Sequence, residues 1–191
     1  MQSSSAPLPN PVTRDEALAT LANEMDAFTT TLTALSDEAF WAVPTVEGRA
    51  RWSPAQNLHH LIRSSTITRL ALRLPGFVLR WQWGRPNRPS RSYGQLAQRY
   101  DEKLALVPAG TVNRFSPQVQ PAPGERARLM LQWQREQQRF TATTKGWRET
   151  DLDKYLIGHP LLGRITVREL LYFTAYHTAH HHKLVLTRSF V

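Results

Sequence analysis

Three segments of the chain begin with the same local signature, a capping box, in which Ser or Thr is followed three residues later by Gln or Glu. The pairs are Ser53 with Gln56, Ser92 with Gln95, and Thr166 with Glu169. In a capping box each side chain accepts a hydrogen bond from the backbone N–H of the other residue, so each pair marks a helix start. Apolar residues then recur at steps of three and four, and no long stretch alternates as a strand would. The sequence therefore predicts an all-α fold.

Caps, apolar stripes and prolines also bound the predicted elements. Thr13 caps a first helix, and residues 36–44 form a short helical turn. Further helices are expected at 54–74, 92–107, 125–146 and 166–188. The proline-rich connections 75–91 and 108–124 are expected to be long and irregular, and "HPLLGRI" (159–165) to be briefly extended. The expected product is a bundle of four long helices with additional short helices.

Length and composition favour one domain and exclude several kinds of site. A chain of 191 residues, 41% of them hydrophobic, suits a single core. We expect a flexible N-terminal tail at 1–12 and one domain at 13–191. The chain has no cysteine, which excludes disulfides, thiolate metal ligands and a Cys nucleophile. It shows no signal peptide and no run of 18 apolar residues, so we expect a cytoplasmic protein with no membrane partner.

Four of the seven histidines fall in "YHTAHHHKLV", Tyr176 to Val185. His177 and His181 are four residues apart, so on a helix they point the same way. Their stripe continues through Leu170 and Phe173, which are core-type residues, and the two imidazoles are therefore predicted to face inward. His180 and His182 lie to either side of the stripe. His182 is expected to face solvent.

Two inward imidazoles at i and i+4 form half of a metal site, because both can reach one ion without bending the helix. His60, on the helix expected at 54–74, is the candidate third ligand. Such pairs also occur by chance, and a core histidine is often only a hydrogen-bonded packing residue. No inward acid is spaced to satisfy both His177 and His181, whereas a metal ion would do so.

Two motifs resemble the DinB-like superfamily of four-helix-bundle metalloenzymes. "WSPAQNLHHL" (52–61) is similar to the start of the family's second helix, and "TVRELLYFTAYHTAHHHKLV" (166–185) is similar to its last. The resemblance implies an up-down-down-up bundle in which His60, His177 and His181 bind a divalent ion, usually zinc or nickel. It also implies relatives that transfer low-molecular-weight bacterial thiols onto electrophiles, and thiol-dependent maleylpyruvate isomerases. His59 beside His60 is a departure, and leaves His59 as an alternative ligand.

Three functions are open at this point. The first is a metal-dependent thiol S-transferase or hydrolase, acting on a small-molecule substrate in a homodimer. The second is a non-catalytic bundle that binds a metal or ligand. The third and least favoured is nucleic-acid binding through "FVLRWQWGRPNRPSR" (77–91), which interleaves aromatics and arginines in a chain of net charge +9. The alternative for that segment is that its aromatics cap the bundle while its arginines are solvated. Glu169 could act as a base near the site, although its capping box already explains it.

Overall fold

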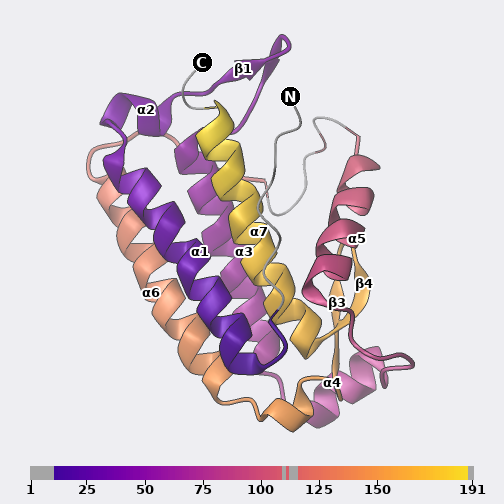
Figure 1. The fold of residues 1–191 in the computed structure, drawn as a ribbon. Helices are drawn as coiled ribbons and strands as arrows, with labels where there is room; N and C mark the ends of the chain where they lie inside the picture. The colour runs from indigo at the N-terminus through magenta and orange to yellow at the C-terminus, as the bar shows by residue number, and fades with distance from the viewer. Residues whose placement is uncertain (1–10, 109–110, 112–115, 189–191) are drawn as a thin grey trace.

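The computed structural model describes residues 11–108, 111 and 116–188, and it is helical over most of them (Figure 1). The helices are α1 (Arg14–Ala34), α2 (Asp37–Trp41), α3 (Pro54–Leu72), α4 (Gly76–Trp83), α5 (Tyr93–Ala105), α6 (Glu125–Lys145), the 3-10 turn η1 (Glu149–Asp151) and α7 (Val167–Arg188). The strands are β1 (Thr45–Val46), β2 (Arg49–Ala50), β3 (Leu156–His159) and β4 (Gly163–Thr166). They form only two short antiparallel hairpins. The all-α prediction is confirmed.

Four long helices, α1, α3, α6 and α7, form the bundle. Figure 1 shows α1 and α7 running in one direction and α3 and α6 in the other, which is the up-down-down-up order. The pairs α1–α7, α3–α6, α3–α7 and α1–α6 are in contact, and α5 packs on α7 outside the bundle. Because α3 contacts α7, side chains from these two helices can meet in the interior.

The predicted helix starts are confirmed in detail. The Ser53 hydroxyl accepts a hydrogen bond from the backbone N–H of Gln56 at 3.2 Å. The side-chain Oε1 of Gln56 accepts one from the backbone N–H of Ser53 at 2.9 Å. Thr13 begins α1 with the same reciprocal geometry. These caps satisfy N–H groups that have no partner within the helix, so they fix where the bundle helices begin.

A buried ion pair links α3 to α6. Arg69 donates to both carboxylate oxygens of Glu136, at 2.7 and 3.1 Å, and the two residues are 8% and 4% exposed. A charged pair taken out of water is tolerated when it is bidentate and fully hydrogen-bonded. The pair therefore adds a buried polar contact between α3 and α6.

The prediction of an irregular connection at 75–91 is wrong for its first half, which forms α4. Pro75 precedes the helix with a φ of −58°, and the turn from Pro75 O to Leu79 N is closed at 3.1 Å. Leu79 is fully buried, and that burial holds a helix whose sequence alone carries no strong cap.

The aromatics of α4 divide between the core and the surface. Trp83 packs against the core, and its Nε1 would lie 2.6 Å from a Cβ placed on Gly158 of β3. Phe77 and Trp81 are instead 75% and 87% exposed. The interpretation that the aromatic residues of this segment cover the end of the bundle therefore holds for Trp83 only.

The β3–β4 hairpin leads directly into α7. The expected extended segment is present, but the pairing begins earlier, where Leu156 lies opposite Thr166. Gly163, with a φ of +73°, supplies the left-handed conformation at the turn. The β1–β2 hairpin was not predicted.

Residues 1–10 of the predicted flexible tail lie outside the described residues. Pro11 and Val12 contact α7, where the Tyr172 hydroxyl donates to Pro11 O at 2.8 Å. No helix in the described part of the chain is long and apolar enough to span a membrane.

Candidate metal centre

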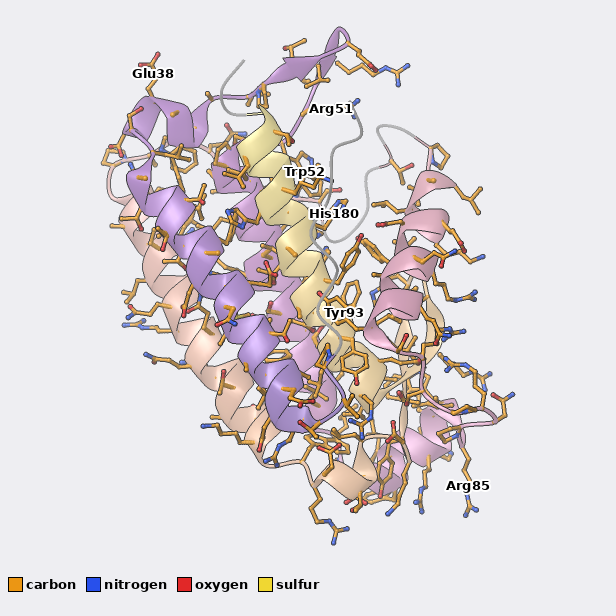
Figure 2. The ribbon with its side chains drawn as sticks, in the orientation of Figure 1. Glu38, Arg51, Trp52, Arg85, Tyr93 and His180 are labelled. Atoms are coloured by element: carbon orange, nitrogen blue, oxygen red, sulfur yellow. The ribbon has the colours of Figure 1, made fainter. Side chains whose placement is uncertain are left out.

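The bundle brings His60 of α3 together with His177 and His181 of α7. The Nε2 atom of His177 lies 3.1 Å from the Nε2 of His60 and 3.1 Å from the Nε2 of His181. One nitrogen from each of the three rings lies within 4.8 Å of the other two. Trp52 and His180, which are labelled in Figure 2, mark the place of this cluster beside α7.

Asn57, one turn before His60 on α3, sets the tautomer of His181. The His181 Nδ1 and the Asn57 Oδ1 are 2.7 Å apart, and both atoms are buried. The Asn57 amide nitrogen donates to Trp52 O at 3.2 Å and to Ser53 O at 2.9 Å, which orients its oxygen toward His181. The oxygen can only accept, so the proton lies on Nδ1 of His181 and the Nε2 lone pair points into the cluster.

Burial favours the neutral form of His177. His177 and His181 are each 5% exposed. Desolvation, reinforced by the neighbouring histidines, holds the pKa of His177 well below its usual value. A metal-binding histidine must be neutral, so this environment prepares the ring for a cation.

Aromatic rings fix the orientations of the three imidazoles. Trp52 stacks on His181 with ring centroids 6.0 Å apart and planes inclined by 8°, and it lies 4.9 Å from the ring of His60. Phe173 stacks on His177 at 4.9 Å. Trp52 and His60 are more exposed than the two α7 ligand candidates, so the cluster is closest to solvent on the α3 side.

The residues fit a divalent transition metal. Three imidazoles with converging nitrogens match the donor set of catalytic zinc sites, which keep a fourth position open for water or substrate. Imidazole suits zinc and nickel alike. Hydrogen bonds among the three rings cannot satisfy the cluster as fully, because each neutral ring has one proton and His181 uses its own on Asn57.

His59 faces another part of the bundle. Desolvation is the largest cause that lowers the pKa of His59, the positive charges of Arg63 and of Arg128 on α6 lower it further, and the charge of Glu125 on α6 raises it. Its surroundings are therefore those of the α3–α6 side. The structure brings His60, and not His59, to the α7 histidines.

The expectation that His182 faces solvent is wrong. Its Nε2 lies 2.7 Å from the Thr31 hydroxyl of α1, and its ring meets Phe28 edge-on at 5.9 Å. The close contact of α1 with α7 covers this side of the helix.

Glu169 lies away from the cluster and is fully buried. It accepts the Thr166 N–H at 3.0 Å, completing the capping box, and two hydrogen bonds from Arg88 at 2.7 and 2.9 Å. The guanidinium group of Arg91 also forms an ion pair with the Glu169 carboxylate, at 3.1 Å. The capping interpretation is confirmed, and Glu169 also ties the connection after α4 to α7.

His159 of β3 lies near the cluster and was missed by sequence reasoning. Its ring meets Phe173 at 4.2 Å, and its Nδ1 accepts the N–H groups of Leu161 and Leu162. Burial lowers its pKa to about 4. No spacing pattern connects it to the helical histidines, because a hairpin delivers it. Asn57 was also missed as a functional residue, although its position three before His60 placed it on the same helix face.

One of the comparisons with known proteins identifies a family for this chain. None of the curated proteins matches the chain. One similar solved structure is the crystal structure of colibactin self-resistance protein ClbS in complex with a dsDNA, with 13% sequence identity and a TM-score of 0.49 over 93% of this chain and 95% of that one. The family model of the DinB superfamily matches residues 21–185, which include α3 and α6 completely, most of α1 and α7, and all three clustered histidines. The chain therefore belongs to the DinB superfamily.

Proposed function

We propose that the protein is a divalent-metal-dependent enzyme in which His60, His177 and His181 hold Zn²⁺ or Ni²⁺. The observation that carries the proposal is the convergence of their three Nε2 atoms, with the two contacts at 3.1 Å. The orientation of His181 by Asn57 supports it, since metal-binding histidines commonly donate their other N–H to a fixed acceptor.

Some residues of the proposed site would bind the metal ion, and others would control access to it from solvent. His177 and His181 supply neutral lone pairs from the buried side, and the half-buried His60 completes the set toward solvent. When bound, the ion would act as a Lewis acid and lower the pKa of a water or thiol in its open position. Trp52 covers part of the exposed side, where its ring would limit water and contact the apolar part of a substrate.

The proposed reaction is transfer of a low-molecular-weight thiol onto an electrophile, or hydrolysis. Because the chain has no cysteine, a thiol nucleophile must come from a cosubstrate. The excess of Lys and Arg over Asp and Glu, 24 to 15, suits acidic groups on that cosubstrate. The alternative is a bundle that binds a metal or ligand without catalysis, and turnover with a thiol and an electrophile separates the two.

Metal analysis of the purified, untagged protein tests the proposal. We expect about one divalent ion per chain, and loss of most of it when His60, His177 or His181 is replaced by Ala, because two ligands no longer enclose the ion. His59→Ala is the matched control and should retain the metal. Binding should weaken below about pH 6, where free imidazoles become protonated. Stoichiometric metal in all three ligand variants, or none in the wild type supplied with zinc and nickel, would refute the site.

Nucleic-acid binding is a second candidate function, which the exposure of Phe77 and Trp81 favours. Exposed aromatic rings can stack on bases, and neighbouring arginines can contact phosphates. Such binding should weaken steeply as salt concentration rises. Absence of binding to DNA and RNA at low salt would remove this candidate.

A further inference from the structure

A cavity of about 270 Å³ lies between the connection after α4 and the β3–β4 hairpin. Residues 85–88 line one side, and Leu156, Arg164 and Thr166 line the other. Arg85 and Arg88 come from the connection after α4, and Arg164 comes from β4, so the tertiary fold brings Arg164 to the other two arginines.

The positive charge of the cavity exceeds the negative charge around it. Within the described part of the chain, neither Arg85 nor Arg164 forms an ion pair with a carboxylate, and Arg164 donates only to Trp83 O, at 3.3 Å. Arg88 pairs with Glu169, but this carboxylate is shared with Arg91. Arg85, Arg88, Arg91 and Arg164 therefore carry four positive charges, and their ion pairs include one carboxylate, that of Glu169.

The other nearby carboxylate is already neutralised. Asp153 accepts three hydrogen bonds from Arg168, at 2.8, 2.9 and 3.1 Å, and also one from the Ser90 hydroxyl. Burial acts to raise the pKa of Asp153, but the hydrogen bonds from Arg168 and Ser90 outweigh it and hold this pKa below its usual value. The uncompensated charge at the cavity is therefore carried by arginine.

We propose that this cavity binds the phosphate group of a small phosphorylated ligand. A phosphate offers several acceptor oxygens in different directions, which suits guanidinium groups that arrive from separate segments, whereas a carboxylate offers two oxygens in one plane. The volume is below the common range for drug-sized ligands, so a phosphomonoester fits better than a dinucleotide. Asn87 also lines the cavity, and its amide group offers a further donor.

This site is separate from the histidine cluster. Thr166 and His177 are eleven residues apart on or beside α7, which corresponds to about 16 Å along a helix. Figure 2 shows Arg85 near the lower end of the molecule, whereas Trp52 and His180 lie in its upper half. One phosphomonoester cannot contact both sites, and the cavity is therefore a second binding site.

Titration calorimetry with inorganic phosphate and glycerol phosphate, at constant ionic strength, tests the proposal on the full chain. We expect saturable binding with one site per chain. Arg164→Gln and Arg85→Gln should each weaken it by about tenfold, which corresponds to about 1.4 kcal/mol. The double variant should bind no phosphate measurably.

Two controls locate the effect. Arg135→Gln removes one positive charge from an exposed position on α6, on the other side of the bundle, and should leave binding unchanged. His177→Ala should also leave it unchanged, because the metal proposal and the phosphate proposal concern different sites. Circular dichroism of every variant checks that the helices are intact. Equal weakening by Arg135→Gln, loss of binding in His177→Ala, or wild-type binding by the double variant overturns the proposal.

Vesicles distinguish a free phosphate ester from a lipid headgroup. Phosphatidylcholine vesicles with and without phosphatidic acid present the same phosphomonoester on a surface. Co-sedimentation only with phosphatidic acid, lost in the double variant, would assign the site to a lipid headgroup. Absence of binding to phosphate, to glycerol phosphate and to these vesicles overturns the proposal, even if the protein binds an oligonucleotide.

Discussion

Replacing Asn57 by Leu removes the acceptor of the His181 Nδ1–H and keeps a side chain of similar volume. In the structure this contact is 2.7 Å long and buried, and the Asn57 amide is held by two backbone carbonyls. The substitution therefore frees the ring of His181 to rotate or to change tautomer. We expect weaker metal binding although no proposed ligand has been touched.

The size of the expected loss in metal affinity follows from the role of a residue that hydrogen-bonds to a metal-binding histidine. Loss of the partner of a metal-binding histidine typically lowers metal affinity by about 10- to 100-fold, or about 1.4 to 2.8 kcal/mol. A buried N–H without an acceptor also destabilises the metal-free protein by about 1–3 kcal/mol. The two effects separate experimentally, because the first appears only in the added stability that metal confers.

Competition with a chromophoric chelator measures metal affinity, and urea unfolding with and without metal measures both contributions. Thr31→Val is the matched control, since it removes the 2.7 Å contact of His182, a histidine on the same helix that lies outside the cluster. Asn57→Asp keeps an acceptor for His181 and should retain affinity while losing the bonds to the backbone carbonyls. Wild-type affinity in Asn57→Leu, or an equal loss in Thr31→Val, would show that Asn57 does not position the ligand.

Four further predictions concern stability and assembly. Glu136→Leu leaves the charge of Arg69 buried without its partner, so urea unfolding should show a loss of about 3–5 kcal/mol, and a loss below about 1 kcal/mol would contradict the burial of the pair. Gly158→Ala brings a Cβ to 2.6 Å from Trp83 Nε1, and should destabilise by about 1–3 kcal/mol in thermal unfolding, whereas a neutral effect would mean that Trp83 does not pack there. His159 has a pKa of about 4 in the folded protein, so between about pH 6.5 and pH 4 it stays neutral there while the same residue in the unfolded chain takes up a proton. Its contribution to the free energy of unfolding should therefore be constant above about pH 6.5 and fall as the pH drops toward 4. If His159→Gln leaves the pH dependence of the free energy of unfolding unchanged in this range, the prediction is wrong. Light scattering should give a homodimer, and a monomer at high concentration would contradict that expectation.

Local chemistry made the helices predictable. The starts of α3, α5 and α7 each depend on two side chains within four residues, and the observed bonds are those of the capping boxes. The i, i+4 spacing of His177 and His181 is likewise a property of one helix. The helical start of 75–91 was missed because α4 is held by the burial of Leu79 and Trp83 and not by a local signal.

By itself the sequence determined the helical elements, the inward pair on α7 and the absence of any thiolate ligand, since each depends on neighbouring residues or on composition. Only the tertiary structure decided that His60 and not His59 joins this pair, because the choice depends on the rotation of α3 between α6 and α7. It also decided that His182 packs on α1, that Asn57 holds His181, and that arginines from two segments meet in one cavity. These are contacts between residues far apart in the chain, and only the packing of the bundle brings them within reach of one another.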